Sequence, residues 1–271
     1  MNSRLLSQLR SMGYRTGDWV LLRAFFLREI RNRYAESIGG GLWTLFHPLV
    51  LLGIYALVFR TIFQVRFPEL GQHAFVEFVA VALWPWLAFQ EGIQRGAQTI
   101  RAHAGLVKKV SFPNELLVVS TVSATFSVHL AGFAIVLSTL ALFGGGLHFS
   151  GIPIVLVALS LLFVLTLAGA LLCAALQVFI PDTEQFLGPF FMILFYATPI
   201  LYPLSLVPGE VADFLGLNPL TYFVEPIRSA LLQGQYKYGL GETLVWSATP
   251  FAYLAALRAF RRFAPYFEDF L

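Results

Sequence analysis

The sequence predicts an all-α polytopic membrane protein with six transmembrane helices, an N-terminal amphipathic interface helix, and extracellular re-entrant helices between the fifth and sixth spans. Three observations support this fold class: the composition, the long uncharged runs, and the placement of the cations. Hydrophobic residues make up 58% of the 271 residues and charged residues only 12%, whereas soluble domains are typically about 45–50% apolar and about 25% charged. We therefore expect a bilayer around this chain.

The first expected element is an amphipathic helix within residues 1–38, a segment that we expect to be cytoplasmic. Helical spacing places an apolar stripe opposite a basic polar face, which is typical of a helix lying in the membrane interface. The stripe consists of Phe26, Leu27, Ile30 and Tyr34, the polar face of Arg28, Arg31, Asn32 and Glu36, and Arg23 and Arg33 lie near the border. The alternative is that these charges only flank the first span, and the pattern alone favours neither interpretation.

Six apolar segments follow within residues 39–260, which we expect to form a single transmembrane domain. A helix needs about 20 apolar residues to cross the hydrocarbon core. The third and fourth segments are the strongest because they contain no Asp, Glu, Lys or Arg, and the sixth is the weakest because Pro250 interrupts it. The expected spans cover approximately residues 41–63, 75–91, 116–143, 152–180, 186–207 and 242–260, followed by a cytoplasmic tail of residues 261–271.

The cations indicate the orientation of these spans. If both termini are cytoplasmic, 14 of the 18 Lys and Arg residues lie inside, in the N-terminal segment, between the second and third spans, and after the sixth. Cytoplasmic loops carry such an excess of cations. The net charge of +3 therefore reflects membrane topology, and we do not expect nucleic acid as a partner.

Two connecting segments are too polar to cross the membrane. Residues 93–113 form a long, weakly amphipathic cytoplasmic connection, and connections of this length usually have a function. Residues 209–240 lie outside and combine apolar side chains with Pro219 and Pro226. We expect short re-entrant or interfacial helices there, because non-helical backbone is tolerated at membrane depth only where protein or water satisfies it.

Motifs for catalysis or metal binding are absent from the sequence. There is no GxxxxGK[ST] phosphate loop, no HExxH and no GxSxG, and no two histidines are four residues apart. We therefore expect no catalytic residue, no metal site and no cofactor in this chain. His129 lies in the middle of the uncharged third span, where an ionisable side chain is a functional candidate. A neutral imidazole that is hydrogen-bonded to a neighbouring helix is the interpretation we favour.

Aromatic residues are abundant, with 27 Phe, 10 Tyr and 5 Trp. In the first and fifth spans several of them recur at helical spacing, and we expect each set to share one face of its helix. Aromatic rings pack against the C–H faces of sugars, so such faces would suit a path for a glycan. For any single residue, ordinary helix packing or an interfacial aromatic belt is the favoured alternative. The candidates for lining this path are Tyr55, Phe59, Phe191, Phe195, Thr198 and Tyr202.

Three stretches resemble motifs of a known family. FLREIRNRYAESIGGGLWTLFHPL, PDTEQFLGPFFMILFYATPILYPLSLVP and LNPLTYFVEPIRSALLQG are similar in spacing and order to the membrane subunits of ATP-binding-cassette polysaccharide exporters. The resemblance covers nearly the whole chain and extends to the O-antigen, teichoic-acid and capsule exporters. One departure is Gly40, where the family more often has a bulkier residue.

The resemblance implies a transport subunit without enzymatic activity in the cytoplasmic (inner) membrane of a bacterium. It implies partners for this chain: a second copy of itself, two copies of a separate ATPase that binds ATP and magnesium, membrane lipids, and a lipid-linked polysaccharide as substrate. It also implies roles for three groups of residues. These are an interface helix with Phe26, Arg28, Ile30, Arg31, Arg33, Tyr34 and Glu36; a coupling segment with Arg95, Arg101, Leu106, Lys108 and Lys109; and an outer re-entrant segment with Asn218, Pro219, Tyr222, Glu225 and Arg228.

Two other functions remain open on the sequence. An exporter of a drug or a lipid would have a similar architecture, although the motifs above are those of the polysaccharide class. An intramembrane enzyme acting on lipid-linked sugars would need carboxylates or histidines gathered at one membrane face. Only Asp182 and Glu184 come close to this, and we interpret them as solvated residues of a short cytoplasmic turn.

Overall fold

The computed structural model describes residues 16–35, 42–62, 75–143, 146–236 and 239–271. Within these ranges the regular structure is helical and contains no strand, which confirms the predicted all-α class for this part of the chain. The helices are α2 (Thr16–Ala35), α3 (Leu42–Tyr55, continued by a π-helical segment Ala56–Ile62), α4 (Phe75–Ala102), α5 (Ala104–Lys109), α6 (Glu115–Phe143), α7 (Ile152–Phe179), α8 (Thr183–Tyr196), α9 (Gly209–Gly216), α10 (Thr221–Leu232), α11 (Leu240–Phe263) and α12 (Phe267–Phe270).

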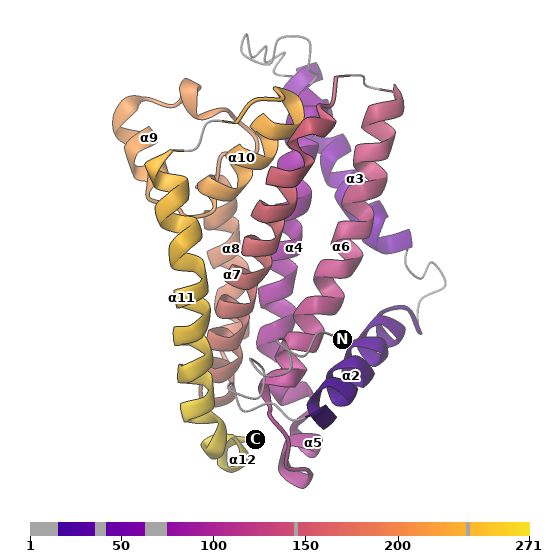
Figure 1. The fold of residues 1–271 in the computed structure, drawn as a ribbon, viewed down its shortest axis with the longest axis vertical. Helices are drawn as coiled ribbons and strands as arrows, with labels where there is room; N and C mark the ends of the chain where they lie inside the picture. Colours follow the sequence, from indigo (N-terminus) through magenta and orange to yellow (C-terminus); the bar gives the residue numbers. More distant parts are fainter. Residues whose placement is uncertain (1–15, 36–41, 63–74, 144–145, 237–238) are drawn as a thin grey trace.

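The long helices run side by side between two ends of an elongated bundle (Figure 1). Helices α5 and α12 lie at one end, and α2 lies obliquely beside it; we call this the α5 end. Helices α9 and α10 lie at the opposite end, which we call the α10 end. The two segments that the sequence identifies as connections therefore lie at opposite ends of the bundle.

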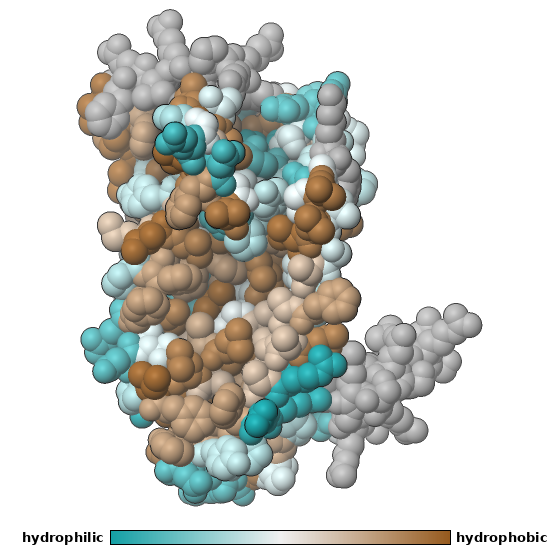
Figure 2. Space-filling model, turned by 90° about the vertical axis from the view of Figure 1, so that its left-hand side faces the viewer, coloured by the Kyte–Doolittle hydropathy of each residue, from teal (hydrophilic) through white to brown (hydrophobic). Residues whose placement is uncertain are grey.

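Two helices in the described ranges are long and apolar enough to cross a membrane, namely Glu115–Leu142 and Phe149–Phe179. They correspond to the two strongest predicted spans. A shorter apolar helix covers Phe46–Phe59. In Figure 2 the face toward the viewer is largely hydrophobic across its middle, and hydrophilic residues gather toward the ends. This distribution fits a membrane protein.

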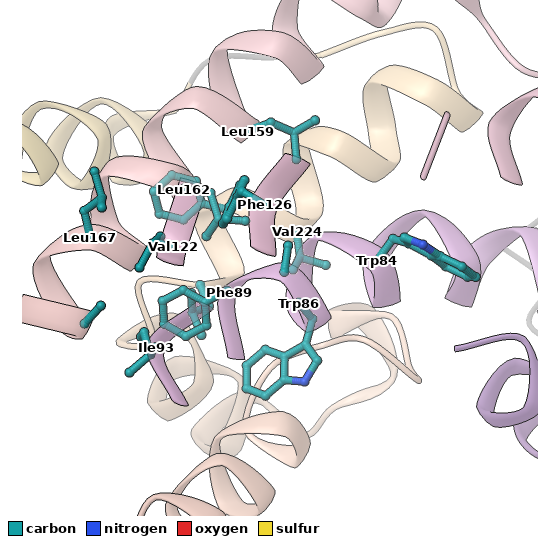
Figure 3. Close-up of a cluster of buried hydrophobic side chains, with 14 of the residues drawn as sticks. Trp84, Trp86, Phe89, Ile93, Val122, Phe126, Leu159, Leu162, Leu167 and Val224 are labelled. Atoms are coloured by element: carbon teal, nitrogen blue, oxygen red, sulfur yellow. The ribbon is translucent and has the colours of Figure 1, made fainter. Parts of the chain in front are cut away.

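Helix α4 is the centre of the bundle and packs against both α6 and α7. Its side chains from Val79 to Leu83 are fully buried, and Figure 3 shows Phe89 and Ile93 of α4 in one cluster with Val122 of α6 and Leu162 of α7. The interior between these helices is filled by side chains, as expected for a packed protein core.

Two glycines allow α4 and α7 to approach closely. A Cβ atom at Gly92 would lie 2.6 Å from Thr166 Cγ2, and one at Gly96 would lie 2.7 Å from Ala170 Cβ. Gly92 and Gly96 are four residues apart and so lie on one face of α4. Small residues at this spacing are typical of tight crossings between membrane helices.

Helix α4 extends beyond the predicted second span, which was expected to end near residue 91. It continues to Ala102, because the polar residues after Gln90 still favour helix and because Ile93, Ala97 and Ile100 continue its buried face. The expected connection of residues 93–113 therefore contains the end of α4 as well as α5.

Helix α8 is shorter than the predicted fifth span, which was expected to reach residue 207. It ends at Tyr196, and turns and bends follow up to the short 3₁₀ helix Leu204–Leu206. Pro199 and Pro203 have no backbone N–H and disfavour the helical conformation of the preceding residue. The expectation that residues 191, 195, 198 and 202 share one helical face is therefore wrong.

Candidate functional site

A polar cluster joins α2, α4 and α6. We call it the Glu91 cluster, and it consists of Arg33, Glu91, Arg95, Thr125 and His129. Glu91 Oε1 accepts hydrogen bonds from Arg33 Nη2 and Arg95 Nε, both at 2.6 Å. His129 Nε2 lies 2.6 Å from Glu91 Oε2, and Arg33 Nη1 lies 3.5 Å from Thr125 Oγ1. Each carboxylate oxygen thus has a charged or polar partner.

Burial makes these contacts important for the packing of α2. The Arg33 side chain is only 9% exposed and that of His129 4%, whereas that of Glu91 is 28% exposed. A buried charge needs a partner and hydrogen bonds to remain ionised. The prediction that His129 is hydrogen-bonded to a neighbouring helix is confirmed. That its partner is Glu91 was not predicted, because the two residues are 38 positions apart in the chain.

A second junction joins α2 to the segment around α5. Arg28 Nη2 lies 2.6 Å from His103 Nε2, and His103 Nδ1 lies 2.9 Å from the Thr99 carbonyl oxygen. Because arginine only donates, Nε2 of His103 accepts and its Nδ1 carries the proton. Arg28, expected on the side of α2 away from its apolar stripe, therefore contacts the bundle. The ring of Phe25 packs 5.7 Å from that of Phe112, which follows α5.

The remaining interface-helix residues show which side of α2 faces the bundle. Phe26 and Ile30 are half-buried and Arg31 is exposed, as expected. Arg33, expected near the border of the apolar stripe, points into the bundle toward Glu91. Glu36 and the side chain of Tyr34 lie outside the described residues. The packing of α2 against α6 favours a structural role for this helix over charges that only flank a span.

The residues expected in the coupling segment are divided between two helices. Arg95 and Arg101 lie on α4, and Arg95 belongs to the Glu91 cluster. Leu106, Lys108 and Lys109 lie on α5. Leu106 is half-buried, whereas both lysines are exposed. Helix α5 thus offers two cations to the surface at its end of the bundle.

Glu184 in the first turn of α8 is another junction near the α5 end. It accepts hydrogen bonds from Gln98 of α4 and Gln177 of α7, at 2.8 and 3.1 Å. Asp182 and Glu184 are both exposed, in agreement with the predicted solvated turn. The two amide donors give Glu184 a further structural role, because they fix the start of α8 to the centre of the bundle.

Aromatic rings from α3, α4 and α8 meet in one group. Phe195 stacks 6.0 Å from Tyr55 and lies edge-on to Trp86 at 5.6 Å. Phe191 is 1% exposed and contacts Trp86 and Phe89. Such a buried position favours the packing alternative for Phe191, whereas Phe195 is only half-buried.

The other candidates for lining a path have different surroundings. Phe59 stacks 5.3 Å from Phe75 at the start of α4. Thr198 is buried and its hydroxyl donates to the Leu194 carbonyl oxygen. Tyr202 donates from its hydroxyl to the Tyr196 carbonyl oxygen at 2.6 Å. Thr198 and Tyr202 thus stabilise the end of α8, and a role in lining a path stays a prediction.

The α10 end contains a buried arginine that binds the chain after α8. Arg228 of α10 is 3% exposed. Its Nη2 donates to the carbonyl oxygens of Pro199 and Ile200 at 2.7 and 3.1 Å, and its Nη1 pairs with Glu225 at 2.6 Å. The guanidinium also lies 3.6 Å from the centre of the Phe78 ring. Arg228 therefore joins α10 to α4 and to the break after α8.

Asn218 and Tyr222 complete this junction. Asn218 Nδ2 donates to the Ala197 carbonyl oxygen and to Thr198 Oγ1, at 3.0 and 2.8 Å. The Tyr222 hydroxyl donates a hydrogen bond to the Gly216 carbonyl oxygen. The backbone carbonyl oxygen of Tyr222 accepts a hydrogen bond from the indole N–H of Trp246. Pro219 is exposed in the turn between α9 and α10. Asn218, Tyr222 and Arg228, three of the five residues predicted for this segment, are thus joined by hydrogen bonds to other parts of the α10 end, and Glu225 pairs with Arg228.

Comparison with known proteins gives one family. Residues 20–232 match the ABC-2 type transporter family. The O-antigen export system permease protein RfbA of Myxococcus xanthus is 32% identical over 208 residues, which cover 74% of this chain and 75% of that protein. RfbA of Klebsiella pneumoniae is 26% identical over 214 residues, 78% of this chain and 80% of the relative. The polysialic acid transport protein KpsM of Escherichia coli is 25% identical over 227 residues, 82% and 84% of the two chains.

Proposed function

Because this chain belongs to the ABC-2 type transporter family, we propose that it is the transmembrane subunit of an ATP-driven exporter that moves a lipid-linked polysaccharide across the cytoplasmic membrane. One observation carries this proposal. Relatives named for O-antigen export and for polysialic acid transport align over most of this chain and most of their own length. ATP and magnesium bind to a separate ATPase chain, and this chain provides the path.

The proposed topology has six spans, formed by α3, α4, α6, α7, α8 and α11, with both termini in the cytoplasm. Two observations support it: α5 and α12 lie at one end of the bundle with α2 beside it, and 14 of the 18 Lys and Arg residues belong to this side in the predicted orientation. The α10 end then faces outward, with α9 and α10 as the re-entrant helices.

The ATPase docks at α5 in this proposal. The exposed Lys108 and Lys109 offer cations there. Arg28 of α2 bonds His103 just before α5, so a movement of α5 would reach α2, and through the Glu91 cluster it would reach α4 and α6. The proposed path of coupling therefore follows contacts between described residues.

Two copies of the chain form the channel. The interior of one bundle is filled by α4, whose residues Val79 to Leu83 are 0% exposed, so a polymer needs a path outside a single bundle. Helix α8 has a large apolar surface for a second copy or for lipid, since Phe186, Met192 and Ile193 are 66%, 65% and 71% exposed.

The test is to delete the chain in its own cell and to identify chemically the glycan that is retained inside. We expect a lipid-linked polysaccharide to accumulate in the cytoplasmic leaflet and to disappear from the cell surface, and the wild-type chain on a plasmid to restore export. Unchanged surface glycan in the deletion strain would refute the proposal. Accumulation of a lipid without a glycan would point to the lipid-exporter alternative.

A further inference from the structure

The C-terminal end of the chain packs directly beside α5. Helix α12 contacts both α5 and α7, and Figure 1 shows α12 and α5 at the same end of the bundle. Phe267 in α12 is 0% exposed and Val107 in α5 is 3% exposed. A four-residue helix does not stay ordered on its own, so its burial against the bundle holds it in place.

Aromatic rings attach α12 to the ends of two long helices. Phe179 at the end of α7 lies 6.0 Å from Phe267 and 4.9 Å from Phe270. Phe260 of α11 lies edge-on to Phe267 at 5.3 Å. Edge-on aromatic pairs contribute beyond their buried area. The support for α12 thus comes from α7 and α11.

An ion pair fixes the chain just beyond α5. Arg261 of α11 donates from Nε to Glu115 Oε1 at 2.7 Å, and its Nη2 lies 2.7 Å from the same oxygen. Glu115 is the first residue of α6, and its side chain is 5% exposed. The connection that follows α5 is therefore held to α11 by a largely buried carboxylate.

A polar hollow of about 460 Å³ lies between these contacts. Its walls include Lys108 and Lys109 of α5 together with Pro265 and Glu268. The last turn of α5 therefore borders open space and is held in place by the contacts around the hollow.

From these contacts we infer that Arg261 and helix α12, together the C-terminal brace, are positioning elements that hold α5 in the orientation that binds the ATPase. This inference rests on the proposed function, in which α5 docks the ATPase. The brace does not touch the reacting ATP. It acts by restricting the orientation of α5, so its loss raises the concentration of ATPase needed for docking, while the maximal rate of the assembled complex changes little.

The test compares two aromatic truncations one residue apart in the complete permease–ATPase complex. Phe267→Ala removes the buried ring of the brace, and Tyr266→Ala removes a neighbouring ring that is 57% exposed. ATP hydrolysis is measured while purified ATPase is titrated onto reconstituted permease. We expect Phe267→Ala to raise the half-saturating ATPase concentration about five- to tenfold, the lower part of the range for coupled sites, with maximal hydrolysis near wild type. Tyr266→Ala should match wild type in both quantities.

Arg261→Met provides a second variant that leaves every aromatic ring in place, and it should also raise the half-saturating concentration. Lys108→Glu with Lys109→Glu tests the docking surface itself and should weaken binding strongly. If the lysine variant loses affinity while Phe267→Ala and Arg261→Met do not, the brace is overturned and the proposed docking at α5 stands. If none of these variants changes the affinity, both the brace and docking at α5 are wrong. If Phe267→Ala and Arg261→Met lower the maximal rate of ATP hydrolysis but leave the half-saturating ATPase concentration unchanged, part of the permease is misfolded and the folded part still binds normally. This outcome would also overturn the brace.

Discussion

Arg33 and Glu91 are 58 residues apart in the chain, and their side chains meet at 2.6 Å where α2 lies against α4. The Arg33 side chain is 9% exposed. Its contact with Glu91 connects a helix that is proposed to lie in the membrane interface with the central helix of the bundle. Removing one partner of such a pair leaves the other charge poorly solvated.

The first prediction concerns this pair. Arg33→Met should lower the free energy of unfolding by about 1.5–3 kcal/mol, the range for a hydrogen bond to a charged group, and should release α2 from α6. Arg31→Met is the matched control, because Arg31 is exposed on the same helix and exposed substitutions usually stay within about 0.5 kcal/mol. The measurements are the thermal unfolding midpoint in detergent and the rate of protease cleavage within α2. Equal cleavage rates for both variants would contradict the role of Arg33.

The sequence predicted the position of α6 and α7 well and missed the Glu91 cluster. The third and fourth spans contain no charged side chain, so their apolar runs begin and end close to the helix ends. Glu91 stands at the edge of the second apolar run, where a charge is normally read as the end of a span. Its partners come from α2 and α6, and no local pattern identifies contacts between residues so far apart in the chain.

Two other features of the structure that we did not predict are indicated by the sequence. Gly92 and Gly96 have the four-residue spacing of a close helix crossing, although the sequence does not say which helix crosses α4 there. Pro199 and Pro203 interrupt an apolar run that the sequence predicts as one span, and proline disfavours a continuing helix. This signal is weak by itself, because α4 and α11 continue through Pro85 and Pro250. The partner of the break after α8, Arg228, again lies far along the chain.

The second prediction concerns the crossing of α4 and α7. Gly96→Ala places a methyl group 2.7 Å from Ala170 Cβ and 3.2 Å from Val122 Cγ2, so the helices must separate. Overpacking of this kind costs about 1–3 kcal/mol. Gly188→Ala is the control, because a Cβ there meets nothing within 4 Å and alanine favours helix over glycine by about 1 kcal/mol. Thermal unfolding of the two variants should shift in opposite directions, and a stabilised Gly96→Ala would contradict the close packing.

The third prediction concerns Arg228. Arg228→Met removes both hydrogen bonds to the chain after α8 and leaves Glu225 without this partner. Glu225 itself is 34% exposed, so the main loss is that of the charged donor to the buried carbonyl oxygens of Pro199 and Ile200. A hydrogen bond to a charged group contributes about 1.5–3 kcal/mol, so we expect less assembled protein in the membrane. Arg258→Met should accumulate normally because Arg258 is exposed on α11. Arg228→Lys keeps the charge but has no planar fork for two carbonyl groups, and it should give an intermediate amount. Normal accumulation of Arg228→Met would show that the junction is dispensable.

The fourth prediction concerns topology. Reporter fusions at His148 and Gln235 should read outside the cytoplasm, and one after Glu268 should read inside, because the cations favour this orientation. A fusion at His73, which lies outside the described residues, should also read outside. A cytoplasmic reading at His148 would invert α6 and α7 and refute the six-span arrangement.

The last prediction separates packing from lining among the aromatic residues. Phe191 is 1% exposed, so Phe191→Ala should cost about 3–5 kcal/mol as a core cavity and should lower assembled protein and export together. Phe195 is half-buried and stacks on Tyr55, so Phe195→Ala should cost less stability. If Phe195 also faces the glycan, Phe195→Ala should slow glycan export while the amount of assembled protein stays unchanged, because the sugar rings lose an aromatic surface.

A charge at position 195 gives the sharper comparison. In packed hydrocarbon, Phe195→Asp costs about 2.5–3.5 kcal/mol on insertion scales, whereas beside a water-filled path the carboxylate stays hydrated and costs little. Ile193→Asp is the control: Ile193 is on the same helix and 71% exposed, and it faces lipid or a second copy in the proposed arrangement. The quantities to compare are assembled protein and exported glycan. Parallel loss of both for Phe195→Asp, as large as for Ile193→Asp, means that Phe195 only packs the bundle and that the aromatic path is wrong. If Phe195→Asp still assembles and Ile193→Asp does not, Phe195 borders water, as a glycan path requires.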